Sequence, residues 1–117
     1  MNMDRKELLN FIIVSWRFSN LFQQVISKLP EEERKRYTGR HNWYNKQLES
    51  TIKSCGYKVI NISNEIYDPG MALTPINIDE FTEGERLIVD YMVEPIIMDE
   101  NGNIVKTGTA ILRRQDT

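Results

Sequence analysis

Cysteine and histidine are nearly absent from this chain of 117 residues, which contains one of each. A single cysteine, Cys55, excludes a disulfide within the chain and is typical of a reducing compartment. It lies at the predicted end of a helix, where the negative end of the helix dipole opposes a thiolate. We therefore interpret Cys55 as a small buried apolar residue. The single histidine, His41, excludes metal sites built on several imidazoles and is interpreted as a packing or surface residue.

Long apolar runs are lacking as well. The run from Leu8 to Val14 holds seven residues with Asn10 inside it, far fewer than the ~20 that cross a bilayer. Acidic residues precede this run and no small-residue cleavage site follows it, which is unlike a signal peptide. We expect a cytoplasmic protein that does not bind membranes.

Motifs for catalysis are missing from the sequence. It contains neither a phosphate-binding loop nor a dinucleotide fingerprint. Four acidic residues gather around a predicted turn without the alternating positions of a calcium loop, so we interpret this segment as a solvated loop. We expect no catalytic residue, no metal, no cofactor and no enzymatic activity. The acidic cluster consists of Asp79, Glu80, Glu83 and Glu85.

Charge divides the chain into two halves. Residues 1–56 contain ten Lys and Arg against six Asp and Glu, a balance of +4, and residues 57–117 contain five against eleven, a balance of −6. An acidic half binds phosphate poorly, and the cations of the first half are spread as on solvated helix faces. We expect no nucleic-acid partner.

The first half has the pattern of a helical hairpin. Asp4 and Glu7 form a possible capping box for a helix that reaches about Lys28. A second helix is expected from Pro30, with Gly39 as a candidate point of division and Gly56 as the residue that ends it. Apolar residues of the first helix lie at helical spacing on more than one face, so it must bury more than one face. The main set is Leu8, Phe11, Ile12, Phe18, Phe22, Val25 and Leu29.

A second apolar set lies to the side of this main set in the first helix. Within a small chain, a β domain covers one side of a hairpin, and a second helix or a second copy must cover the other. We expect a homodimer of the four-helix-bundle type. Its predicted interface includes Leu9, Ile13 and Trp16.

From Tyr57 onward the apolar period changes to two, which indicates strands. One long strand is expected over 86–98 and another ends near Leu112. If Asn101-Gly102 forms a type I′ turn, Tyr91 faces Leu112 and Val93 faces Ala110. The predicted fold class is therefore α+β, with a helical hairpin for dimerisation (1–56) and a small antiparallel β domain for partner binding (57–117).

The β half resembles the GrpE family of nucleotide exchange factors. The resemblance covers roughly residues 40–114. It rests on Tyr67-Asp68-Pro69 followed by Met71-Ala72, and on Gly102 followed by Gly108-Thr109-Ala110-Ile111-Leu112. In the family, two residues separate Asp-Pro from a His or Met, whereas here Met71 comes one residue early. The first helix is also shorter than in the family.

The resemblance implies a cochaperone without enzymatic activity. It implies a homodimer whose β domain binds the ATPase domain of a DnaK-type chaperone and promotes ADP release. Carried over by position, the implied contact residues are Asp68, Pro69, Met71 and Lys106. The alternative is an adaptor on the same scaffold that binds a different protein or ATPase.

Overall fold

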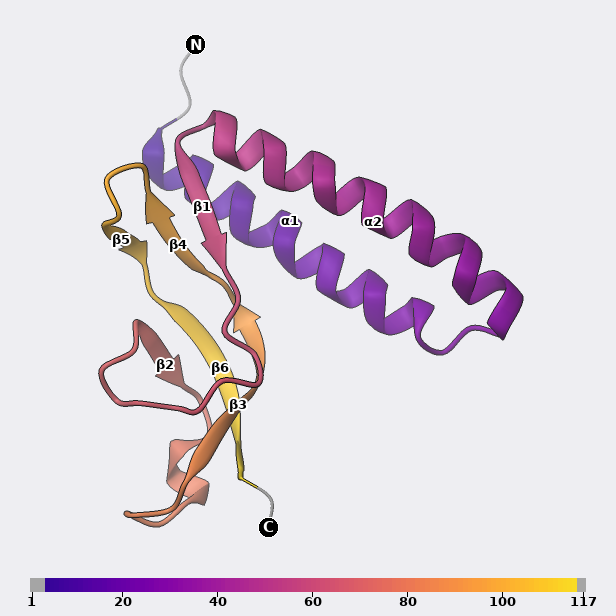
Figure 1. Cartoon of the computed structure of the whole chain (residues 1–117). Coiled ribbons are helices and arrows are strands. Elements are labelled where there is room, and N and C mark those ends of the chain that lie inside the picture. The colour runs from indigo at the N-terminus through magenta and orange to yellow at the C-terminus, as the bar shows by residue number, and fades with distance from the viewer. Residues whose placement is uncertain (1–3, 116–117) are drawn as a thin grey trace. The chain divides into compact units, whose positions relative to one another are not determined.

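The computed structural model describes residues 4–115 and has the predicted α+β class, with two long helices followed by six short strands. The chain divides into two compact units, residues 1–57 and 58–117. The first unit contains both helices and the second contains the two small sheets (Figure 1).

The helical unit is a hairpin of α1 (Arg5–Ile26) and α2 (Glu31–Ser54), packed side by side (Figure 1). Pro30 lies just before α2, at a position where the helix does not need a backbone N–H from this residue. Gly39 does not divide α2, because the helix is continuous through it. Gly56 has a φ of 87°, the left-handed conformation expected of a residue that ends a helix. The predicted capping box is wrong, since the side chain of Asp4 makes no capping hydrogen bond.

The β unit consists of two three-stranded sheets. One has the order β1-β4-β5, with bounds Tyr57–Ile60, Ile96–Asp99 and Ile104–Lys106. The other has the order β2-β6-β3, with bounds Leu73–Pro75, Gly108–Arg114 and Leu87–Glu94. A short 3-10 helix, η1 (Ile78–Glu80), connects β2 to β3. Because β2 runs parallel to β6, the second sheet is mixed rather than purely antiparallel.

The predicted long strand and its pairing need correction. Pro95 divides the run over 86–98 into β3 and β4, because proline has no N–H to donate to a ladder. The turn after β4 is not type I′, since Gly102 has a positive φ and Asn101 does not. Tyr91 pairs with Ile111 rather than with Leu112, and Ala110 pairs with Met92 rather than with Val93, because the register shifts on either side of Tyr91-Met92.

Two residues fix how β6 sits in its sheet. The amide of Asn77 donates to the Leu112 carbonyl and accepts from the Leu112 N–H, both at 2.9 Å, so its side chain continues the pairing beyond β2. Gly108 lies where a Cβ would come within 2.7 Å of Met92 Cε and 2.9 Å of Ile96 Cγ1. Gly108, the first residue of β6, therefore lies so close to the core that a larger residue would not fit without a shift. The buried apolar residues of this unit are Leu73, Leu87, Val89, Met92, Ile96, Ile97, Ala110 and Leu112.

Candidate functional site

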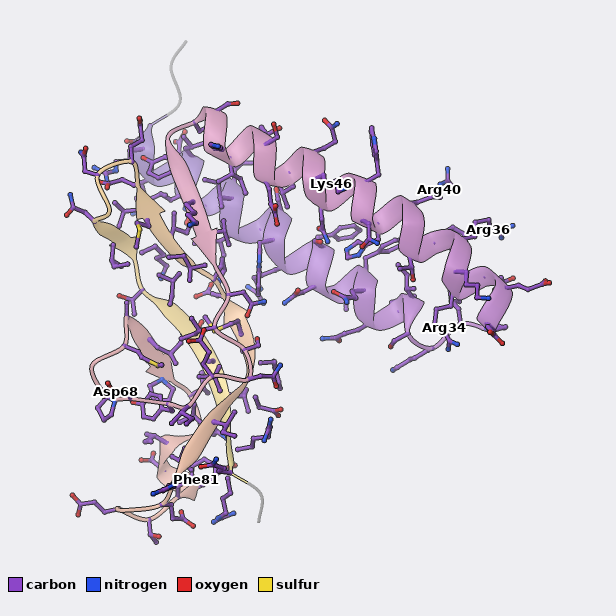
Figure 2. All side chains as sticks on the ribbon, in the orientation of Figure 1. Arg34, Arg36, Arg40, Lys46, Asp68 and Phe81 are labelled. Atoms are coloured by element: carbon purple, nitrogen blue, oxygen red, sulfur yellow. The ribbon has the colours of Figure 1, made fainter. Side chains whose placement is uncertain are left out.

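The turn at Asp68 is exposed at the surface of the β unit (Figure 2). Asp68 Oδ1 accepts a hydrogen bond from the Gly70 N–H at 3.0 Å, and the Asp68 carbonyl accepts one from the Met71 N–H at 2.9 Å. Pro69 is exposed between them and Met71 is half-buried. An aspartate that bonds to the backbone two residues later, followed by proline with its fixed φ, stabilises such a turn locally.

Strand pairing joins the end of this turn to the strand that begins two residues after Lys106. The Gly108 N–H donates to the Ala72 carbonyl at 3.1 Å, directly after Met71 and two residues after Lys106. Lys106 Nζ lies 4.0 Å from Glu94 Oε1, in a partly exposed ion pair. The parallel pairing of β2 with β6 therefore joins the end of the Asp68 turn, at Ala72, to the strand that follows Lys106.

Two carboxylates of the acidic segment that follows β2 accept hydrogen bonds, Glu80 from the Asn77 amide at 3.1 Å and Glu85 from two donors. Arg114 Nε donates to Glu85 Oε1 at 2.7 Å, and the Thr82 N–H donates to Glu85 Oε2 at 2.8 Å. These bonds hold the pKa of the Glu85 carboxyl below its ordinary value, and the bond from Arg114 contributes the most. A lowered folded-state pKa stabilises the fold at neutral pH, and this contribution is lost as the pH falls through that pKa. Arg114 also lies over the ring of Phe81, 5.0 Å from its centroid. Asp79, Glu80 and Glu83 are exposed, as in a solvated loop.

An apolar stripe runs along the exposed face of α1. Its five members are spaced by three and four residues in alternation, which places them on one side of a helix. Each is between 50% and 63% exposed. Exposed apolar residues are ordinary one at a time, whereas a continuous row of them marks an interaction surface. This surface, called here the α1 stripe, consists of Phe11, Val14, Phe18, Leu21 and Val25.

The dimer interface suggested by the sequence falls on another side of α1. Ile13 is 6% exposed, and Leu9 and Trp16 are half-buried. A glutamate at Ile13 would therefore disturb packing within the chain whatever its effect on a dimer. The open apolar surface of the hairpin is the α1 stripe.

Beside the α1 stripe, an aromatic groove of about 230 Å³ opens between the two helices. Phe18 and Phe22 are stacked with centroids 6.3 Å apart, and the ring of Phe22 lies 5.8 Å from that of His41. The other wall of the groove is formed by residues of α2 that lie three and four positions apart and so share one face of that helix. The groove is lined by Phe18, Ser19, Phe22, Tyr37, Arg40, His41 and Tyr44.

A buried polar cluster lies at the base of the groove. His41 is 5% exposed, and its Nε2 lies 2.9 Å from both the carbonyl and the Oγ of Ser19. A carbonyl can only accept, so Nε2 carries the proton, and the Ser19 hydroxyl donates to Asn45 Oδ1. Every member has a partner, which explains how polar groups are tolerated between the helices. His41 is thus a packing residue, one of the two roles predicted from the sequence.

Cationic side chains follow α2 past the groove (Figure 2). The guanidinium carbons of Arg36 and Arg40 lie 5.1 and 6.0 Å from the centroid of the Tyr37 ring, within the range of cation–π attraction. Arg34 and Lys46 extend the series along the same helix. From Arg34 to Leu48 the sequence contains no acidic residue.

Cys55 and Trp43 are exposed residues of the helical unit. Cys55 is exposed at the end of α2, so its interpretation as a buried residue was wrong. Trp43, on α2, is 65% exposed. Over residues 4–115, no three or more His, Cys, Asp or Glu side chains are grouped so that they could hold a metal ion. In the same range, neither helix has the length and hydropathy to cross a bilayer.

Compared with protein-family models, with curated proteins and with solved structures, the chain matches none of them.

Proposed function

We propose that this protein is a cytoplasmic, non-enzymatic cochaperone of the GrpE type. It acts as a homodimer, and its β unit binds the ATPase domain of a DnaK-type chaperone and promotes ADP release. The observation that supports the proposal is the pairing of the Asp68 turn with the closing strand. The Gly108 N–H donates to the Ala72 carbonyl at 3.1 Å, which joins the segment after Met71 to the segment after Lys106.

The mechanism is selective binding to one conformer of the ATPase. A partner that binds the open nucleotide cleft better than the closed cleft shifts the ATPase toward the open form. The shift cannot exceed the difference between the two affinities. The β unit needs only a rigid surface for this, and Asp68 and Gly108 supply rigidity by fixing the turn and the strand beside it.

Dimerisation supports the same function through the α1 stripe. The stripe has the alternating three- and four-residue spacing of paired helices. From Leu8 to Ile26 the only charged residue is Arg17, so two copies of α1 meet with little like-charge repulsion. Burial of each half-exposed side chain contributes roughly 1 kcal/mol on each copy. A second copy of α1 is therefore the occupant that we propose for this surface.

The conformer preference gives the first prediction. Calorimetric titration should show at least tenfold tighter binding to the nucleotide-free ATPase domain of a DnaK-type chaperone than to its ATP-bound form. Asp68→Asn keeps an oxygen to accept from the Gly70 N–H but removes the charge, so we expect it to weaken binding about tenfold, or ~1.4 kcal/mol.

The matched control is Asp79→Asn, which removes the same charge from an exposed position in η1. Its affinity should stay within twofold of the unmodified protein. Equal weakening by both variants would show that net charge, rather than the Asp68 turn, governs binding. Equal affinity of the unmodified protein for both nucleotide states would contradict the conformer preference.

A second candidate follows from the internal partners of the contact residues. Asp68 bonds to its own turn, and Lys106 is paired with Glu94. Both charges are thus partly used within the β unit. This observation favours an adaptor that keeps the dimer and the β unit but binds a different protein. Binding to neither nucleotide state of the ATPase domain would select this candidate.

A further inference from the structure

The aromatic groove between α1 and α2 shares Phe18 with the α1 stripe, and its other lining residues take no part in the proposed exchange function. Its lining is aromatic and apolar apart from Arg40, His41 and Ser19. Ser19 and His41 satisfy each other within the hairpin, so they leave the apolar rings as the main contact surface. A groove between two helices with such a lining suits an apolar anchor from an amphipathic helix.

The charged residues around the groove indicate which polar residues should flank that apolar anchor. The helical segments that form the groove, 8–26 and 34–48, contain six cationic residues and no acidic residue. Lys35 is paired with Glu31, whereas Arg40 lines the groove and Arg36 lies over the ring of Tyr37, which also lines it. The cations of the two segments are Arg17, Arg34, Lys35, Arg36, Arg40 and Lys46.

This charge pattern excludes a second copy as the favoured occupant of the groove. A second hairpin would bring its own cationic α2 against that of the first, and like charges in such an interface oppose association. Complementary charge instead favours an acidic ligand, which also associates faster because the field steers it.

We propose that the aromatic groove binds an acidic amphipathic segment of another protein. Aromatic or leucine side chains of that segment enter beside Phe22, Tyr37 and Tyr44, and its carboxylates pair with Arg36 and Arg40. Arginine suits this role because its planar guanidinium stacks on Tyr37 while it still donates to a carboxylate. The proposal involves the helical unit alone and is independent of ADP release.

The test is a fluorescence-anisotropy titration of the full chain with a labelled helical peptide. The probe has about four turns, glutamate on its polar face, and phenylalanine and leucine at the i, i+3 and i+7 positions. We expect saturable binding that weakens as salt is added. Replacement of every glutamate by lysine, or of the anchors by alanine, should weaken binding at least tenfold.

Protein variants locate the site. Arg40→Glu should weaken binding of the acidic peptide at least tenfold, and Arg36→Glu should act in the same direction. Lys53→Glu makes the same charge change at an exposed position in the last turn of α2 and should change affinity less than twofold. Circular dichroism should show that all three variants keep the helical content of the unmodified protein.

Four results would overturn the proposal. One is a lysine peptide that binds as tightly as the acidic peptide. A second is an affinity that is unchanged by Arg40→Glu. A third is tighter binding of a single-stranded oligothymidylate than of the acidic peptide, which would make the groove a nucleic-acid site. The fourth is a fall in the mass of the protein by light scattering as the peptide binds, which would show that a second copy occupies the groove.

Discussion

Replacement of Leu21 by glutamate is expected to convert the dimer into monomers. Light scattering should give twice 13.8 kDa for the unmodified protein and 13.8 kDa for the variant. Leu21 is 55% exposed and does not line the aromatic groove, so the change spares both the fold and the groove. In a symmetric dimer the variant buries two carboxylates against apolar side chains. We expect the dissociation constant to rise more than a hundredfold, about 2.8 kcal/mol or more.

The matched control for this variant is Gln24→Glu. Gln24 is exposed on α1 but lies outside the α1 stripe, so the same charge is added where no second copy is expected. The control should keep the mass of the unmodified protein. A single mass shared by all three proteins, whether monomeric or dimeric, would contradict the role of the stripe.

Substitution of Gly108 by alanine is expected to destabilise the β unit by about 2–3 kcal/mol, at the upper end for overpacking in a core. The added Cβ would lie 2.7 Å from Met92 Cε, 2.9 Å from Ile96 Cγ1 and 3.0 Å from the Glu94 carbonyl. The methionine end can move, but the carbonyl is backbone and cannot move without shifting β3. Hydrogen exchange of the β3 and β6 amides should therefore accelerate.

Gly39→Ala is the matched control, because an added Cβ there meets nothing within 4 Å. It replaces a glycine inside α2, so we expect the helical unit to gain roughly 0.5–1 kcal/mol. Both tryptophans, Trp16 and Trp43, lie in the helical unit, and their fluorescence follows its unfolding by urea. Unchanged amide exchange in Gly108→Ala would show that β6 is free to shift away from the core.

Local sequence signals predicted the helical unit well. The helices follow from apolar spacing, and Pro30 and Gly56 mark where α2 begins and where the chain leaves it. Such signals act within one turn of helix and need no knowledge of the rest of the fold. The exceptions are Asp4, whose side chain makes no cap although its position fits one, and Gly39, which does not divide α2.

Strand pairing could not be predicted in the same way. Period-two spacing indicates a strand but not its neighbour, and the parallel pairing of β2 with β6 joins segments more than thirty residues apart. The register of β3 depends on Pro95 and on the close approach of Gly108 to Met92. These are contacts between distant residues, which a local pattern does not contain.

The candidate sites show the same division. Proline and glycine predicted the Asp68 turn, but only the fold pairs the end of that turn with the strand that follows Lys106. The aromatic groove was missed because it requires knowing how the two helices face each other. One signal was available: Tyr37, His41 and Tyr44 share one face of α2, and the stretch from Arg34 to Leu48 around them contains no acidic residue.

Release of labelled ADP from a DnaK-type ATPase, followed by stopped flow, tests the proposed function most directly. With the unmodified protein at saturation, release should be at least tenfold faster than from the ATPase alone. The Asp68→Asn variant should need a higher concentration to reach the same rate, since it changes affinity for the ATPase. A release rate that stays at the basal value at every concentration of the unmodified protein would contradict the account.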